Sequence, residues 1–157
     1  MRSAPSDNER DFTRFVKETE PRLSYALAAA YGIEIGAEAT ADALAWAWEH
    51  WGKVEEMENP AGYLYRVGQS KARRHFRPAV LFPSVRGMGP GAVDVDLDVA
   101  LTCLTKNQRV AAVMIYGLGY TEREVADLLG ISRWSVRTHA ERGLAKLRRA
   151  LEVKIDV

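Results

Sequence analysis

The chain has 157 residues, of which 47% are hydrophobic and 27% charged, and its formal net charge is +1 at pH 7. This composition is typical of one or two small globular domains and excludes a disordered chain. One cysteine and three scattered histidines exclude a disulfide framework and a multi-cysteine zinc site. No apolar run approaches the roughly 18 residues that span a bilayer, and the first residues lack the apolar stretch of a signal peptide, so we expect a cytoplasmic protein.

The near-zero net charge is a sum of opposed blocks. Residues 34–58 hold seven acids and one base, whereas residues 59–93 hold six bases and no acid. Residues 132–151 hold six bases and a single acid, Glu141. Two basic blocks indicate two contacts with a polyanion, and the acidic block indicates a third surface for a different partner.

The N-terminal segment predicts a helix with one apolar face. Pro21 should kink or split this helix. Gly32 and Gly36 should then bracket a turn. The apolar face comprises Phe12, Phe15, Val16, Leu23, Ala26, Leu27 and Ala30.

The next helix is predicted over about residues 37–51. Its spacing places Trp46 opposite the apolar face and beside Asp42 and Glu49. Two interpretations of Trp46 are open: it packs under the linker or a neighbouring helix, or it anchors a protein-partner surface. The predicted core face comprises Ala37, Ala41, Leu44, Trp48 and Trp51.

Asn59 and Pro60 predict the start of a helix that runs to about residue 77. Leu64, Val67 and Gly68 should face inward, opposite a basic stripe without acids. Such a stripe is either a solvated surface or a nucleic-acid contact, in which aromatic rings stack on unpaired bases. The stripe comprises Arg66, Gln69, Ser70, Arg73 and Arg77, and Tyr63, Tyr65 and Phe76 flank it.

Residues 77–92 hold the densest concentration of proline and glycine, which predicts an interdomain linker of roughly 15 to 20 residues. Its VLFPSV core could instead dock on a domain surface. We therefore expect an all-α protein of two small helical domains, at residues 8–77 and 98–153, joined by a Pro/Gly-rich linker at residues 78–97.

The C-terminal third predicts a helix-turn-helix. Capping boxes begin at Thr105 and Thr121, and Gly130 supplies the positive φ of a tight turn before Ser132 caps a longer helix. Small and aliphatic residues at the helix crossing complete the motif: Ala126, Ile131 and Val136.

The last helix should bury one face and present a basic one. The N-terminal residues of a recognition helix reach base edges in the major groove, and later arginines reach phosphates. We assign Arg133, Trp134, Arg137, Thr138 and Glu141 to bases, and Arg142, Arg148 and Arg149 to phosphates. The inward residues are Val136, Ala140, Leu144, Leu147 and Leu151. A plain three-helix domain with a basic surface is the alternative.

We find no catalytic constellation, so we expect no enzyme, no cofactor and no metal. His139 has no base or nucleophile at a useful offset and is interpreted as structural or solvated. Cys103, in an apolar stretch, is predicted to be a buried small hydrophobic residue.

Several stretches together resemble the extracytoplasmic-function (ECF) group of bacterial sigma factors, in the sigma-70 family. They are EPRL at 20–23, ADALAWAW at 41–48, NPAGYLYRV at 59–67, YTEREVA at 120–126 and SVRT at 135–138. The resemblance implies that domain 2 binds the β′ clamp helices of core RNA polymerase and melts the minus-ten promoter element. Domain 4 would read the minus-thirty-five element as duplex.

The resemblance also implies residue roles and partners. Polymerase binding falls on Asp42, Leu44, Trp46, Trp48 and Glu49, and the minus-ten contact falls on Arg66, Gln69, Ser70, Arg73, Arg74 and Arg77. The partners implied are core RNA polymerase, promoter DNA and an anti-sigma factor. Trp134 stands where the family has a small residue, so we expect an unusual promoter preference.

Two other functions remain open. The chain could be a stand-alone dimeric helix-turn-helix regulator, or an interaction module that sequesters another factor through Trp46 and binds no DNA. Because domains of this size have small cores, we expect each one to be marginally stable and stabilised by a partner.

Overall fold

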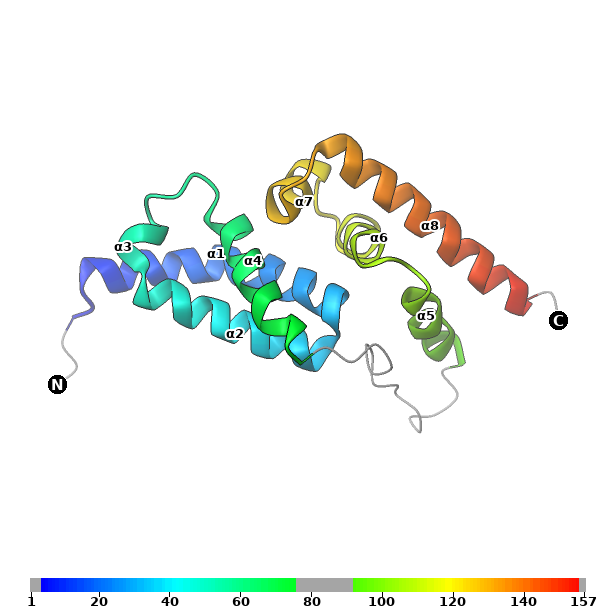
Figure 1. Cartoon of the computed structure of the whole chain (residues 1–157), viewed down its shortest axis with the longest axis horizontal. Coiled ribbons are helices and arrows are strands. Elements are labelled where there is room, and N and C mark those ends of the chain that lie inside the picture. The colour runs from blue at the N-terminus through cyan, green and yellow to red at the C-terminus, as the bar shows by residue number, and fades with distance from the viewer. Residues whose placement is uncertain (1–3, 76–91, 156–157) are drawn as a thin grey trace.

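The computed structural model describes residues 4–75 and 92–155, and every regular element in these ranges is helical (Figure 1). The all-α fold class is therefore confirmed. The first range contains α1 (Asp7–Tyr31), α2 (Ile33–Glu49), α3 (Trp51–Val54) and α4 (Pro60–Arg73). The second contains α5 (Ala92–Thr102), α6 (Lys106–Ala112), the π-helical turn η2 (Val113–Gly117), α7 (Glu122–Leu129) and α8 (Arg133–Ile155).

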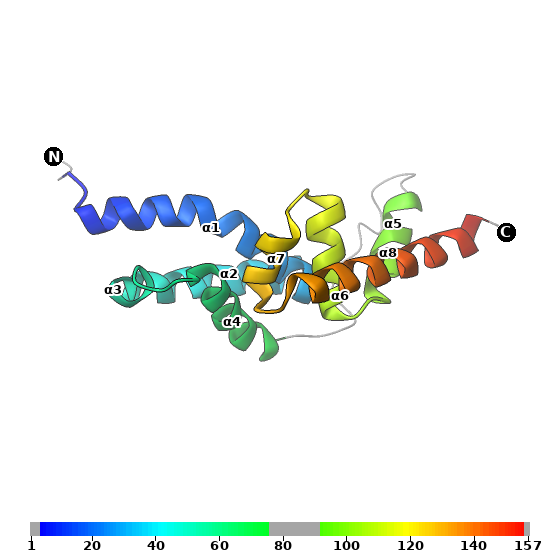
Figure 2. The same cartoon turned by 90° about the horizontal axis from the view of Figure 1, so that it is seen from above.

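Helix α1 is one continuous helix of 25 residues, which begins with a capping box at Ser6 and contains Pro21 in its interior. Of the two outcomes predicted for Pro21, a kink or a split, the split was wrong, because α1 continues through this residue (Figure 2). Pro21 lies on the exposed side of α1, where water can bind the carbonyl that loses its helical partner.

Helix α2 packs closely along α1 through small residues. Gly36 lies inside α2 rather than in the predicted turn. It allows α2 to approach α1 closely, since a Cβ there would lie 2.6 Å from the backbone of Ala28. The buried face of α2 comprises Ala39, Thr40, Ala43 and Ala47. The core face predicted for this helix was therefore wrong in four of its five residues, since Ala37, Ala41 and Trp48 are exposed and Leu44 is half-buried. The fifth, Trp51, is buried as predicted and belongs to α3. The closest helix approach selects small side chains, which a periodicity of large apolar residues does not reveal.

Helix α4 is capped as predicted: the Asn59 side chain accepts from the Gly62 amide at 3.1 Å, and Pro60 occupies the first turn. Its inner face buries Leu64, Tyr65, Gly68 and Ala72. Tyr65 is only 2% exposed, so the prediction that it stacks on bases was wrong, and burial raises the pKa of its phenol. Phe76 lies outside the described residues.

The helix-turn-helix forms as the sequence predicts. Both capping boxes, at Thr105 and Thr121, are complete, and Gly130 adopts the left-handed conformation with φ of 69°. Val136 and Ala140, on the inner face of the last helix, are buried. Leu144, Leu147 and Leu151 are half-buried.

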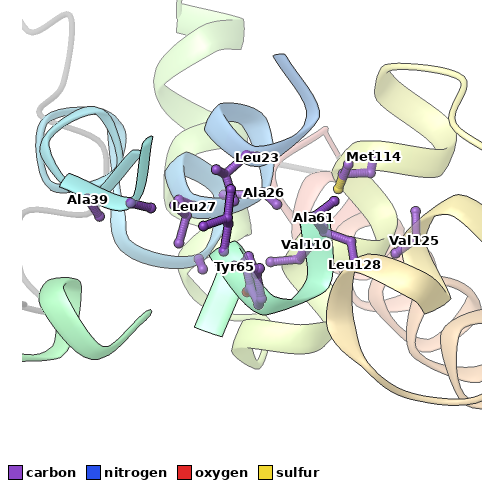
Figure 3. Packing of buried hydrophobic residues seen from close by; sticks show 14 of the residues in the cluster. Leu23, Ala26, Leu27, Ala39, Ala61, Tyr65, Val110, Met114, Val125 and Leu128 are labelled. Carbon is purple, nitrogen blue, oxygen red and sulfur yellow. The ribbon is translucent and has the colours of Figure 1, made fainter. Parts of the chain in front are cut away.

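Residues on both sides of the undescribed stretch share one core. Leu23, Leu27 and Tyr65 cluster with Val110 and Leu128 (Figure 3). Most of the predicted linker lies outside the described residues, but its last part, residues 92–97, belongs to α5. Cys103 is exposed, so its predicted burial was wrong. Within the described ranges, no helix is both long and apolar enough to cross a membrane.

Candidate nucleic-acid interface

The start of α8 is fixed by local hydrogen bonds. The Ser135 amide donates to Ser132 Oγ at 3.0 Å, which caps the helix directly after the Gly130 turn. Burial of Val136 and Ala140 then sets the rotation of the helix about its axis. As a result, the opposite face of α8 points away from the core.

That outer face carries the residues that the sequence assigned to DNA. Trp134, at the second position of α8, is 72% exposed. Thr138 is half-buried, and its hydroxyl donates to the Trp134 carbonyl at 3.0 Å. The others are exposed: Arg133, Arg137, Glu141, Arg142, Arg148 and Arg149. A basic, convex helix with an exposed N-terminal end has the shape and charge of a major-groove reader.

Arg137 is oriented by a residue that the sequence interpretation missed. Its Nε and Nη2 donate to the two carboxylate oxygens of Glu122 at 3.0 and 3.1 Å, from α8 to the first turn of α7. These hydrogen bonds lower the pKa of Glu122 and raise that of Arg137. The remaining guanidinium donors stay available to a base or a phosphate. The capping box at Thr121 was the available signal, since it fixes the position of Glu122.

A second basic surface lies on α4. Arg66, Ser70, Arg73 and Arg74 are exposed and Gln69 is half-buried. Arg77 lies outside the described residues. Among the described residues no ion pair neutralises these arginines, and the residues that follow α4 as far as His75 add no acid. The exposed guanidinium groups therefore remain available to phosphates.

The acidic helix α2 forms a third surface. Asp42 and Glu49 are exposed, and Trp48 is 45% exposed with its ring 4.9 Å from that of Phe12. Trp46 is half-buried, stacked on His50 at 4.3 Å and against Tyr63 of α4 at 5.3 Å. Of the two interpretations of Trp46, packing on a neighbouring helix is the one that the structure supports. The exposed aromatic ring of this surface belongs to Trp48.

Comparisons with known proteins agree with this arrangement. Residues 94–147 match the family model described as sigma-70, region 4. This segment is therefore similar to sigma-70 region 4. The segment contains α6, α7 and the first two thirds of α8, so both helices of the helix-turn-helix lie within the match. No curated protein matches the chain.

Two solved structures share the fold of nearly the whole chain. One is the sigma factor RpoE in complex with the anti-sigma factor NepR from Bartonella quintana, at 20% identity and a TM-score of 0.63, covering 92% of this chain and 98% of that one. The other is CnrH in complex with the cytosolic domain of CnrY, at 22% identity and a TM-score of 0.60, covering 94% and 91%.

The two kinds of similarity agree with the resemblance to sigma factors. Region 4 alone accounts for the C-terminal helices, whereas the structural match extends over the N-terminal helices as well. A stand-alone dimeric regulator would need only the helix-turn-helix, and nothing in the comparisons favours it. The chain shares the fold of these two solved structures, and its helix-turn-helix lies in the segment that is similar to sigma-70 region 4.

Proposed function

We propose that the protein is an ECF-type sigma factor that binds core RNA polymerase and directs it to one class of promoters. The observation that carries this proposal is the joint presence of region 4 and a sigma-factor fold over both halves of the chain. The chain contributes binding surfaces only, and the bond-forming chemistry belongs to polymerase. We place it in the cytoplasm, where polymerase acts.

Region 4 supplies the duplex contact. In this proposal α8 enters the major groove of the minus-thirty-five element, with Arg133, Trp134 and Arg137 nearest to the bases. Arg142, Arg148 and Arg149 follow along the helix and hold phosphates. The large exposed ring of Trp134 suits an apolar contact, such as a thymine methyl group, and so favours a distinct promoter preference.

The N-terminal half supplies two other contacts. The basic face of α4, with Arg66, Arg73 and Arg74, meets the backbone of the minus-ten element, and Gln69 and Ser70 lie beside it for hydrogen bonds. Helix α2 presents acids and the exposed Trp48 to the clamp helices of the β′ subunit. Aromatic side chains within a polar rim are frequent anchors of protein interfaces.

We also propose a protein partner that restrains the factor. The RpoE structure contains an anti-sigma factor, and CnrH is bound to a domain of CnrY. A partner of this class would bind the same fold here and control its access to polymerase.

Two exposed tryptophans allow a reciprocal test. Trp48→Ala should weaken binding to core polymerase, measured with fluorescently labelled protein, and leave binding to a minus-thirty-five duplex unchanged. Trp134→Ala should do the opposite, so each variant is the control for the other. If neither variant nor the wild-type protein binds core polymerase, the sigma-factor proposal is wrong and duplex binding alone would favour the stand-alone regulator.

A further inference from the structure

Glu122 and Arg137 form a side-on ion pair between the two helices of the helix-turn-helix. Nε and Nη2 of Arg137 donate to the two carboxylate oxygens of Glu122, at 3.0 and 3.1 Å. The Arg137 side chain is 57% exposed and the Glu122 side chain 28% exposed, so the pair lies at the surface. An ion pair at the surface contributes little to stability. Its geometry, rather than its stability, is what bears on DNA binding.

Both partners of this ion pair project from rigid backbone. Glu122 is the first residue of α7, directly after the capping box in which Thr121 Oγ1 accepts from the Glu124 amide at 3.1 Å. The positive end of the helix dipole stabilises a carboxylate at that place. Arg137 follows the fully buried Val136 on α8, and this burial fixes the rotation of the helix about its axis. The two side chains therefore meet at a defined place and in a defined orientation.

The side-on contact leaves the outer edge of the guanidinium open. A guanidinium group carries five N–H donors in one fixed plane. Glu122 occupies the edge formed by Nε and Nη2. The outer edge, formed by Nη1 and Nη2, carries two parallel N–H groups that meet no acceptor within the described part of the chain. This edge is the part of Arg137 furthest from the α8 backbone, so it extends furthest towards a bound duplex.

Two parallel N–H groups match one base in the major groove. Guanine presents two acceptors there, O6 and N7, and a guanidinium fork binds both at once. Adenine presents an acceptor beside an amino donor, cytosine presents an amino donor, and thymine presents one acceptor beside a methyl group. Each of these three bases would leave at least one N–H group of the fork unpaired. The outer edge of Arg137 is therefore selective for guanine.

The ion pair also restricts the charge of Arg137. An unpaired arginine on a recognition helix can turn to a phosphate, which gives affinity without sequence information. Hydrogen bonds from Arg137, together with the charge of Arg133, lower the pKa of Glu122, so this carboxylate is ionised at neutral pH. The ionised carboxylate offsets the charge of Arg137 and fixes the plane of its guanidinium. Glu122 thus favours a base contact over a phosphate contact.

We propose that Glu122 is a positioning residue, which holds Arg137 side-on so that the outer edge of the guanidinium reads a guanine in the minus-thirty-five element. This inference rests on the proposed function and deepens it, because it names the base that is read and the residue that sets the reading. Removal of the Glu122 charge should therefore lower sequence preference and raise affinity for unrelated DNA. A residue that only stabilised the fold would change neither in a folded protein.

The first test compares the sequence preference of four full-length proteins. Wild type, Glu122→Gln, Arg137→Lys and Asp127→Asn each select duplexes from a pool with a randomised window. Asp127→Asn is the matched control, because it removes one exposed carboxylate from the same helix and this carboxylate is not bonded to Arg137. Wild type and the control should select a guanine that Arg137→Lys does not. Glu122→Gln should prefer this guanine roughly tenfold less than wild type, since one bidentate contact gives about tenfold to hundredfold discrimination.

The second test measures affinity for the selected duplex and for an unrelated duplex as the salt concentration rises. Glu122→Gln should bind the unrelated duplex more tightly, with a salt slope steeper by about one, because Arg137 becomes available to a phosphate. Asp127→Asn should leave this slope nearly unchanged. Replacement of the selected guanine by 7-deazaguanine, which lacks the N7 acceptor, should weaken wild-type binding about tenfold and affect Arg137→Lys less.

The double variant of Glu122→Gln and Arg137→Lys separates positioning from an independent contact. If Glu122 acts through Arg137, the double variant should show the same preference as Arg137→Lys alone. A guanine preference that Glu122→Gln retains in full, or a further loss in the double variant, would overturn the inference and leave the proposed function intact. If wild type selects no sequence, either alone or with core polymerase, the duplex contact itself is wrong, and the proposed function fails together with the inference.

Discussion

The two basic helices, α4 and α8, are held in different ways. Helix α4 lies at the centre of the molecule, with Leu64, Tyr65 and Ala72 buried among α1, α2 and α7. Helix α8 buries only its first half, through Val136 and Ala140, and its later leucines are half-buried. Figure 1 shows α8 along the outer edge of the fold, whereas α4 lies on the side of the N-terminal helices that faces α7.

This difference shows that one charge pattern can serve two kinds of surface. The basic residues of α8 stand on a helix that is accessible in the structure as it is. Those of α4 belong to a helix whose N-terminal end is engaged by α7 through Asn59 and Gly62. We therefore expect the outer face of α8 to be accessible to DNA along its length, whereas the N-terminal end of α4 is covered by α7.

The largest difference between α4 and α8 should appear in the free energy of unfolding when one leucine on each helix is truncated. Leu64→Ala removes a fully buried side chain and should lower the free energy of unfolding by about 2–5 kcal/mol. Leu147→Ala, at a half-buried position of α8, should lower it by about 1 kcal/mol or less. Urea unfolding of both variants measures the difference, and equal losses would show that α4 is no more central than α8.

Substitution of one arginine on each basic helix should affect the two proposed DNA contacts separately. Arg137→Ala should weaken binding to a minus-thirty-five duplex by about 1–3 kcal/mol, because it removes a donor that points at the groove. Arg73→Ala should leave that affinity unchanged and reduce the opening of the minus-ten element by polymerase. Fluorescence anisotropy with the duplex and permanganate probing of the opened strand measure the two effects, and a reversed pattern would exchange the roles of the helices.

Backbone strain at the turn before α8 should give a smaller loss. Gly130→Ala forces a side chain into the left-handed region and should cost about 1–2 kcal/mol of stability. No atom lies within 4 Å of the added Cβ, so the loss comes from the backbone alone. Gly130→Asn should recover part of it, since asparagine tolerates this conformation. Equal stability of the alanine variant and wild type would contradict the turn geometry.

The smallest effect concerns the ion pair of Glu122 with Arg137. Hydrogen bonds from Arg137 lower the pKa of Glu122 below its ordinary 4.5. A carboxylate with a lowered folded pKa stabilises the protein above its unfolded pKa, and this stabilisation is lost as the pH falls through the folded value. Glu122→Gln should therefore lower the melting temperature slightly at pH 7 and not at all in strong acid. Glu18→Gln on α1 is the control, and a difference that persists in acid would exclude the ion pair as its cause.

The region 4 half was predictable from sequence because its determinants are local. Thr105, Thr121 and Ser132 each cap a helix with a hydrogen bond to an amide three residues ahead, and Gly130 acts through its own φ angle. Interactions of this range depend on a short stretch of sequence. The residues on the outer face of α8 were exposed as predicted, apart from the half-buried Thr138.

The N-terminal half was less predictable because its determinants are contacts between helices. The buried face of α2 follows from the close approach of Gly36 to α1, and the predicted core tryptophan, Trp48, points outward. The Arg109 side chain donates to the carbonyl of Ala30, 79 positions away, and the Asn59 side chain donates to the carbonyl of Asp127, 68 positions away. No local sequence pattern marks either hydrogen bond. Periodicity thus identified the helices but not how each is rotated in the fold.

Run-off transcription tests the central claim most directly. Purified bacterial core polymerase, this protein and a pool of genomic promoter fragments should yield discrete transcripts that depend on the protein and disappear with Arg137→Ala. A matched substitution at an exposed arginine remote from both DNA surfaces, Arg10→Ala, should leave them intact. Absence of any protein-dependent transcript, together with no binding to core polymerase, would contradict the assignment of this chain as a sigma factor.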